Sequence, residues 1–348
     1  MLVNPTRYLG NLLIAGELIQ QFSRYCSDKG IQLQIVLDES FRDLLINSLP
    51  EAQLVFYPRR AIALASIAGK MRLYLQCLRK IRNFRTDIAF NIEEDSVSHR
   101  LTQLSGARFR LGCSTTRHRY GYHHVLPIDF SRRPADQKHR WYSFAEVFMH
   151  LGLEPGKPGY IHLHPATMNE TATSRMLAAG LKDHTPLAVI HAGATKAYKR
   201  WPTLSFSALA EQLIDKGYQV AFIGSGDDCR ITAEILEMLS AEYKSCTVNA
   251  CGILSLSELA AFLQQASIMI GNDSGPFHLA AALNIPGIVI FGPTEADIWK
   301  PLGRNIRVIQ HRNLCSLQCT RKNCLHAYRC LYAISPDEIM AALSTIAP

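Results

Sequence analysis

The 348 residues of the chain are 48% hydrophobic and 19% charged, a composition that fits a globular protein with two cores and excludes long disorder, collagen-like repeats and an integral membrane protein. The longest apolar stretch, residues 61–69, is far shorter than a membrane-spanning helix, and the first ten residues do not resemble a signal peptide, so we expect a cytoplasmic protein. Residues 1–165 carry 22 basic against 14 acidic residues, whereas residues 166–348 carry 15 of each, so the net charge of +8 lies in the first half. We therefore expect the first half to meet an anionic partner: a phosphorylated acceptor, a membrane surface or a nucleic acid.

The first half alternates short β-rich runs with longer helical patterns. Strands are predicted at residues 2–3, 33–37, 53–57, 87–92 and 109–112, and helices at residues 9–28, 62–81 and 138–151. The Gly- and Pro-rich stretch LEPGKPGY then marks a boundary, and we place the first domain at residues 1–155.

The second half repeats the alternation more clearly. Strands are predicted at residues 187–190, 219–223, 247–249, 268–270 and 287–291, with helices at residues 206–216, 231–239, 257–266 and 278–283 between them. This pattern predicts an α/β protein in which parallel sheets are covered on both faces. We expect two Rossmann-like domains, residues 1–155 and 156–335, facing a central cleft, since ligands bind beyond the carboxyl ends of such strands.

The motif GNDSGPFHLAAAL follows the predicted strand that ends at residue 270. Asp273 or Ser274 is a natural N-cap for a helix, and Gly275 lets a ligand approach the backbone closely. The free N–H groups at this helix start would suit a phosphate, and His278 lies about one turn further on. In the alternative interpretation, these residues only cap a helix and His278 packs inside the protein.

Two further loops follow predicted strands. The loop after residue 190 holds Thr195 and the cations Lys196, Lys199 and Arg200, which suit a diphosphate, although such loops are often only solvated surface. The loop after residue 223 reads GSGDD, in which an acidic residue is placed to hold a ribose diol. An ordinary polar turn is the alternative there.

Together and in this order, the three motifs resemble those of the glycosyltransferase family 9 heptosyltransferases, which build the inner core of bacterial lipopolysaccharide from ADP-heptose. The resemblance is carried by NDSGPFHLAAAL, FGPT and KRWP and covers most of residues 187–303. It implies a GT-B fold with an N-terminal acceptor domain and a C-terminal nucleotide-sugar domain. It also implies inverting transfer of heptose to an inner-core acceptor, no catalytic metal, and a last helix, residues 336–348, that packs back on the first domain.

The resemblance also assigns roles to individual residues. Lys199 is expected on the donor diphosphate, Asp228 on the ribose and Asp273 on the sugar hydroxyls. Lys199 and the helix start after Asp273 would neutralise the departing nucleoside diphosphate. The donor-binding residues implied are Thr195, Lys199, Asp228, Asp273, Ser274, Gly275 and His278.

One position departs from the family pattern. Family members carry Leu-Gly-Asp in the first loop, where the aspartate is the expected general base, whereas this chain reads Leu-Gly-Asn and has Asn11 there. An amide cannot take a proton as a carboxylate does, and such assistance is typically worth ~10²–10⁴-fold in rate. Three alternatives stay open: another carboxylate takes over, the protein is a weak or silent relative that binds nucleotide sugar, or the sequence is an Asp-to-Asn variant. The candidate carboxylates are Glu17, Glu93, Glu94 and Asp95.

A GT-B sugar-nucleotide epimerase is a further alternative, which would act on a nucleotide sugar with no acceptor present.

The stretch from Arg59 to Arg85 contains eight basic residues and no acidic one. It is interpreted either as an amphipathic helix near an anionic acceptor or membrane, or as a solvated helix face. The resemblance favours the first, because the inner-core acceptor carries phosphates and acidic sugars on a lipid anchor. We therefore expect a lipopolysaccharide acceptor bound near Arg59 and Arg60, a protein peripheral to the inner membrane, and no nucleic-acid partner, since no nucleic-acid motif is found.

Four cysteines lie within sixteen residues near the end of the chain, at Cys315, Cys319, Cys324 and Cys330. Four thiols can hold a structural zinc ion, but this spacing differs from the usual paired C-x2-C arrangement. Reduced cysteines that pack a C-terminal turn are the favoured interpretation in a reducing compartment. Apart from the ADP-heptose donor substrate, we expect no required cofactor.

Overall fold

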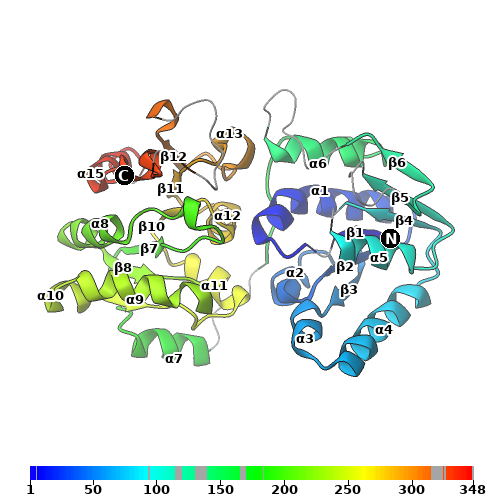
Figure 1. Cartoon of the computed structure of the whole chain (residues 1–348), viewed down its shortest axis with the longest axis horizontal. Helices are drawn as coiled ribbons and strands as arrows, with labels where there is room; N and C mark the ends of the chain where they lie inside the picture. The colour runs from blue at the N-terminus through cyan, green and yellow to red at the C-terminus, as the bar shows by residue number, and fades with distance from the viewer. Residues whose placement is uncertain are drawn as a thin grey trace. The chain divides into compact units, whose positions relative to one another are not determined.

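The computed structural model describes residues 1–4, 6–92, 95–113, 120–128, 130, 139–164, 170–182, 184–314, 324 and 327–346. The chain divides into two compact units, Met1–His164 and Pro165–Pro348 (Figure 1). The division falls somewhat later than the boundary expected at residue 155, beyond the Gly- and Pro-rich stretch. Within the described part of the chain, no helix is both long and apolar enough to cross a membrane.

The first unit is built on a six-stranded parallel sheet in the order β3-β2-β1-β4-β5-β6. Its central strand β1 pairs with β2 through Leu2 and Ile35 and with β4 through Leu2 and Phe90. The inner strands are apolar and buried because helices cover both faces of the sheet. The strands are β1 (Leu2–Asn4), β2 (Gln34–Asp38), β3 (Gln53–Tyr57), β4 (Ile88–Asn91), β5 (Phe109–Cys113) and β6 (His124–Leu126).

Six α-helices and one short 3₁₀ helix are described in the first unit. They are α1 (Leu9–Asp28), η1 (Glu39–Phe41), α2 (Arg42–Leu45), α3 (Arg59–Leu64), α4 (Ile67–Asn83), α5 (Ser96–Gln103) and α6 (Arg140–Met149). The single helix predicted at residues 62–81 is two helices. The chain is extended at Ala65 and Ser66, and the Ser66 hydroxyl accepts a hydrogen bond from Gly69 N at 3.3 Å, which starts α4 anew.

The second unit contains another six-stranded parallel sheet, in the order β12-β11-β10-β7-β8-β9. Counted within each unit, both sheets have the order 3-2-1-4-5-6 of doubly wound folds, which confirms the predicted pair of Rossmann-like domains. The edge strands β6 and β12 were not predicted, since β6 has three residues and β12 is only partly buried. The strands are β7 (Leu187–His191), β8 (Gln219–Phe222), β9 (Thr247–Asn249), β10 (Ile268–Asn272), β11 (Gly287–Phe291) and β12 (Ile306–Gln310).

The helices of the second unit follow its strands in the same alternating way. They are α7 (Glu170–Ala178), η2 (Ala197–Lys199), α8 (Thr203–Asp215), η3 (Gly226–Asp228), α9 (Cys229–Met238), α10 (Ala241–Lys244), α11 (Leu256–Leu263), α12 (Gly275–Ala282), α13 (Ala296–Trp299), η4 (Arg312–Leu314), α14 (Arg329–Tyr332) and α15 (Pro336–Leu343).

The last helix, α15, belongs to the core of the second unit. We expected it on the first domain, but its apolar residues Ile339 and Leu343 are buried in the same cluster as Leu213 of α8. The chain entering α15 is held as well, because Trp201 Nε1 donates to the Ile334 carbonyl at 3.0 Å. The physical reason for this placement is that α8 and the neighbouring strands offer these side chains an apolar surface within their own unit.

This tether generates a stability prediction. Trp201→Phe removes the indole N–H and leaves the buried carbonyl of Ile334 without this donor, so we expect the free energy of unfolding to fall by about 1–3 kcal/mol in urea denaturation. The control is Leu204→Ala at the start of α8, where the side chain is 69% exposed and the change should stay within about 0.5 kcal/mol. Equal stabilities of the two variants would contradict the tether.

Candidate functional site

The polar residues of the second unit gather where β7 and β10 end. These strands are neighbours and pair in parallel through His191 and Gly271, yet the chain continues from β7 and from β10 toward opposite edges of the sheet. Such a switch point is where open α/β sheets bind ligands. Gly271 is required for the close pairing, because a Cβ there would lie 2.6 Å from the His191 carbonyl oxygen.

Asn272, the last residue of β10, holds both ends of the loop that follows β7. Its Nδ2 donates to the Ala192 carbonyl at 2.8 Å, and its Oδ1 accepts from Trp201 N at 3.0 Å. The side chain is fully buried, so these hydrogen bonds satisfy polar atoms that water cannot reach. The loop that carries Lys199 is therefore fixed to the neighbouring strand at both ends.

Within that loop, Lys199 forms an ion pair with Asp273. Its Nζ lies 2.6 Å from Asp273 Oδ2, and the Thr294 hydroxyl donates to the same oxygen at 2.9 Å. The Asp273 side chain is 5% exposed and that of Lys199 is 22% exposed, so a buried carboxylate holds the ammonium while part of the lysine side chain remains open to solvent. The pair thus presents a fixed cation at the end of the sheet.

Thr294 was not among the predicted site residues. It belongs to the FGPT sequence after β11, and Gln310 of β12 fixes this loop by donating to the carbonyls of Gly292 and Thr294. The signal available in the sequence was the position of FGPT directly after a buried strand of the same sheet.

His191 links two further predicted residues. Its Nδ1 lies 2.9 Å from the Ser274 hydroxyl, and its Nε2 lies 3.7 Å from Asp228 Oδ2. Ser274 is the N-cap residue of α12, and its hydroxyl meets His191 instead of capping the helix backbone. His191 was also missed from the sequence, although a histidine at the end of a fully buried strand must find polar partners.

Asp228 stabilises the loop after β8 from the inside. Its Oδ2 accepts hydrogen bonds from Ser225 N at 2.9 Å and from the Ser225 hydroxyl at 2.8 Å. Burial favours the neutral carboxyl, but His191 and Ser225 together outweigh it and lower the pKa of Asp228 to about 2. Its carboxylate also packs on Gly193, where any Cβ would collide with Oδ1, so Asp228 joins the loops after β7 and β8.

The remaining predicted donor residues occupy nearby positions. Gly275 begins α12 directly after Ser274. His278 is buried one turn later, and its backbone N donates to the Ser274 carbonyl oxygen at 3.4 Å. Thr195 is exposed on the same loop as Lys199. All the predicted donor-binding residues are therefore at or next to the loops and helix start that follow β7, β8 and β10.

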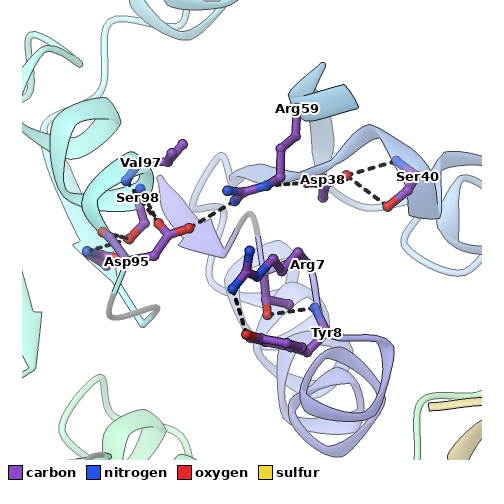
Figure 2. A network of polar contacts seen from close by, with 10 residues as sticks. Arg7, Tyr8, Asp38, Ser40, Arg59, Asp95, Val97 and Ser98 are labelled. Atoms are coloured by element: carbon purple, nitrogen blue, oxygen red, sulfur yellow. Dashed lines mark hydrogen bonds and ion pairs between the residues drawn. The ribbon is translucent and has the colours of Figure 1, made fainter. Parts of the chain in front are cut away.

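The carboxyl edge of the first sheet carries a different charge arrangement (Figure 2). Arg59, the first residue of α3, donates through Nε to Asp38 Oδ2 at 2.8 Å and through Nη2 to Asp95 Oδ2 at 3.0 Å. Asp38 ends β2 and Asp95 follows β4, so the guanidinium bridges the loops on either side of β1. Arg59 thus has two structural partners, whereas its neighbour Arg60 is exposed.

The candidates for a general base are unequal in this setting. Asn11 is partly exposed in the first turn of α1, which follows β1. Asp95 Oδ1 accepts from the N–H groups of Val97 and Ser98, while Oδ2 is held by Arg59, so both oxygens are occupied. Burial raises the pKa of Glu17, as a base would need, but its carboxylate meets Gly159 and it lies six residues after Asn11, about 9 Å along α1 on another face. Glu93 and Glu94 lie outside the described residues.

The cysteine cluster is only partly described. Cys315 and Cys319 lie outside the described residues, whereas Cys330 is buried and the Cys324 sulfur accepts a hydrogen bond from Tyr328 N at 3.3 Å. Across the described ranges, no group of three or more His, Cys, Asp or Glu residues is arranged to hold a metal ion. Both interpretations of the cluster therefore stay predictions.

Two doubly wound parallel sheets, the second with a fixed cation and a helix start at its switch point, are the architecture of GT-B glycosyltransferases. The sequence identifies the family within this class. Residues 74–328 match glycosyltransferase family 9 (heptosyltransferase), and the chain belongs to this family.

Individual relatives are similar over shorter stretches. Lipopolysaccharide heptosyltransferase 2 of Escherichia coli K12 is 39% identical over 112 residues, which are 32% of this chain and 32% of that protein. Lipooligosaccharide heptosyltransferase 2 of Haemophilus influenzae is 34% identical over 152 residues, 43% of this chain and 44% of that protein. The matched stretches thus span less than half of these curated relatives.

The similarity of fold extends over the whole chain. The structure of E. coli ADP-heptose lipopolysaccharide heptosyltransferase II superimposes with a TM-score of 0.74 at 22% identity, covering 99% of this chain and 98% of that one. An E. coli heptosyltransferase determined with ADP gives 0.71 at 19% identity, covering 99% of each chain. At these identities, the two structures establish the fold.

The depressed pKa of Asp228 generates a pH-dependent prediction. Because its folded-state pKa of about 2 lies below the ordinary 3.8, its ionised form contributes stability above about pH 4, and this contribution is lost as the pH falls toward 2. At pH 7, Asp228→Asn should lower the free energy of unfolding by roughly 1–3 kcal/mol, and the difference from wild type should shrink below pH 4.

The measurement is thermal or urea denaturation at several pH values. Asp227→Asn is the matched control, because Asp227 is the exposed neighbour in the same loop and should change stability little. A difference between Asp228→Asn and wild type that is constant with pH would show that the carboxylate charge does not stabilise the loop.

Proposed function

We propose that the protein is an inverting glycosyltransferase that moves heptose from ADP-heptose to a hydroxyl group of an inner-core lipopolysaccharide acceptor, without a catalytic metal. Membership of family 9 supports the reaction class. The observation that carries the proposal is the Lys199–Asp273 pair, with Nζ and Oδ2 2.6 Å apart, at the switch point of the second sheet.

The donor diphosphate is proposed to bind between Lys199 and the start of α12. During transfer, the bond between the anomeric carbon and the diphosphate oxygen breaks, and the electron pair leaves with ADP. Lys199 and the N–H groups at the start of α12 oppose this negative charge as it develops. Because Asp273 and Thr294 already fix the ammonium, little reorganisation is needed when the leaving group gains charge.

The other donor residues complete this proposed site. Thr195 is proposed beside the diphosphate, and Gly275 and His278 along its phosphate end. Asp273, which is paired with Lys199, is proposed to contact the sugar hydroxyls of the donor. Asp228 is proposed at the ribose, and its contacts with Ser225 and His191 would hold its carboxylate in place for that contact.

The acceptor hydroxyl must lose its proton as its oxygen attacks the anomeric carbon, and Asn11 stands where the family has an aspartate. Among the described alternatives, Asp95 is held by Arg59 and two backbone N–H groups, and Glu17 lies on another face of α1. This arrangement supports a second candidate function, in which the protein binds nucleotide sugar but transfers it slowly or not at all.

The acceptor itself is proposed to be an anionic, lipid-anchored core oligosaccharide, with the protein working at the cytoplasmic surface of the inner membrane. The excess positive charge of the first half supports this proposal. Arg60 is the exposed candidate for contact with the acceptor, while Arg59 positions the loops around β1 through Asp38 and Asp95.

Donor binding is predicted to depend on Lys199. Lys199→Met keeps an unbranched side chain, one atom shorter, but removes the cation, and we expect the affinity for ADP in calorimetry to fall at least about tenfold, as for the loss of a charged hydrogen bond. Lys196→Met is the matched control, since Lys196 is an exposed cation of the same loop and should bind ADP like wild type. If the two variants bound ADP with equal affinity, Lys199 would be excluded from the proposed site.

Turnover is predicted to depend on Asn11. With ADP-heptose and a lipid A acceptor that carries the acidic inner-core sugars, Asn11→Asp should release ADP and form product ~10²–10⁴-fold faster than the protein itself. Fast transfer by the unchanged protein would show that another group takes the proton. Conversion of the donor with no acceptor present would favour an epimerase, and ADP binding without turnover in either protein would favour the binding function.

A further inference from the structure

Helices α3 and α4 carry a row of apolar side chains that the fold does not bury. Ile67, Met71 and Leu75 repeat every four residues of α4 and so share one ridge of the helix, with Leu64 at the end of α3. The exposed fractions of these side chains are 80% for Leu64, 87% for Ile67, 59% for Met71 and 44% for Leu75. We call these four residues the apolar ridge.

The apolar ridge is separate from the face by which α4 joins the core. Cys77, Leu78 and Ile81 of the same helix are buried against the first sheet, and Tyr74 is packed beside them. The buried face of α4 therefore already supplies the apolar contacts that this helix makes with the core. The ridge leaves additional apolar surface exposed to water, which is unfavourable in free energy. Neighbouring exposed apolar side chains of this kind mark interaction sites.

The charged residues of the segment that carries the ridge are of one sign. Between residues 52 and 86 the chain has no acidic residue. Arg72 directly follows Met71, and Arg79 lies one helical turn after Leu75, so cations border the ridge. The exposed basic residues of α3, α4 and the segment after them are Arg60, Lys70, Arg72, Arg79, Lys80, Arg82 and Arg85.

The break between α3 and α4 shapes this surface further. The extended backbone at Ala65 and Ser66 separates the two helices, which lie side by side in Figure 1. Leu64 and Ile67, the two most exposed members of the ridge, flank this turn. The most apolar point of the surface is thus a turn between helices, which can enter an apolar layer before the rest of the unit reaches it.

We propose that the apolar ridge docks the first unit on an anionic lipid bilayer. Leu64, Ile67 and Met71 enter the boundary between headgroups and acyl chains, and the surrounding Lys and Arg side chains contact the anionic headgroups. Their long aliphatic stems let the cations stay at the headgroups while the ridge goes deeper. The inference rests on the proposed function in one respect: an enzyme whose acceptor is lipid-anchored has to work at a bilayer.

A bilayer fits this surface better than a protein partner does. Protein interfaces are anchored mainly by Trp, Tyr and Arg in shaped pockets, whereas the ridge consists of protruding aliphatic side chains and one methionine. A fluid bilayer accepts such side chains without a complementary pocket. Its anionic headgroups also match the exposed basic residues that α3 and α4 carry beside the ridge.

The test is co-sedimentation of the full chain with vesicles that contain neither donor nor acceptor. We expect binding to vesicles of phosphatidylglycerol mixed with phosphatidylcholine, weakening at high salt, and much less binding to phosphatidylcholine alone. Ile67→Ser combined with Met71→Ser should reduce the binding constant about tenfold or more, because two apolar anchors are lost.

The matched control places the same change elsewhere. Leu204→Ser combined with Met149→Ser alters two exposed apolar residues outside the ridge, at 69% and 60% exposure, and should bind vesicles like wild type. A third variant, Lys70→Gln with Arg72→Gln and Arg79→Gln, should lose binding to anionic vesicles while keeping the ridge. Melting temperature and ADP affinity, measured on each variant, show that folding and the second unit are intact.

Three outcomes would overturn the proposal. The bilayer is excluded as the partner if the wild-type protein does not bind anionic vesicles. It is also excluded if the ridge variant binds them as the wild type does. A dimer in solution that the ridge variant abolishes would assign the ridge to a second copy of the chain. Since the vesicles lack sugar substrates, a failure here is separate from a failure of transfer, which is measured with a detergent-solubilised acceptor.

Discussion

The second unit depends on the contact between β7 and β10, where the backbone comes so close that only glycine fits at residue 271. This contact brings His191 next to Ser274 and lets the Asn272 amide reach both ends of the neighbouring loop. Lys199 is thereby held near Asp273, although 74 residues separate them in the chain. Gly271, which has no functional side chain, thus allows the close strand pairing that positions the polar residues of the site.

In both sheets, charged side chains join loops at the carboxyl edge. The number of carboxylates that hold each cation differs between the two. In the first unit one guanidinium lies between two carboxylates, so this cation has a structural role. In the second unit a single carboxylate oxygen receives both Lys199 and Thr294, and the lysine keeps part of its surface exposed. This difference agrees with an anionic donor bound by the second unit and with Arg59 as a positioning residue in the first.

Much of this architecture could be predicted from the sequence, because buried parallel strands are nearly continuous apolar runs and the polar residues that follow them meet at one edge. Ten of the twelve described strands were predicted on that basis, whereas the placement of Lys199 and Asp273 in one site came from the family resemblance. The strands β6 and β12 were missed since edge strands are short or half-exposed. His191 and Thr294 were missed because their importance comes from partners distant in sequence.

Other differences came from competition between local and tertiary effects. Helical periodicity continues through residues 65 and 66, and only the serine cap shows that a new helix starts there. The last helix was assigned to the first domain by resemblance, whereas its Ile339 and Leu343 fill the core of the second unit. Periodicity predicts which face of a helix is apolar, but it does not specify the surface that covers that face.

Trp201 connects the loop of Lys199 to the segment that enters α15. The backbone N–H of Trp201 donates to the Asn272 side chain, and its indole N–H donates to the carbonyl of Ile334. During synthesis the domains of a protein form from the N-terminus onward. Residue 334 is made after the strands of both sheets, so the loop around Lys199 gains this support only once synthesis has passed Ile334.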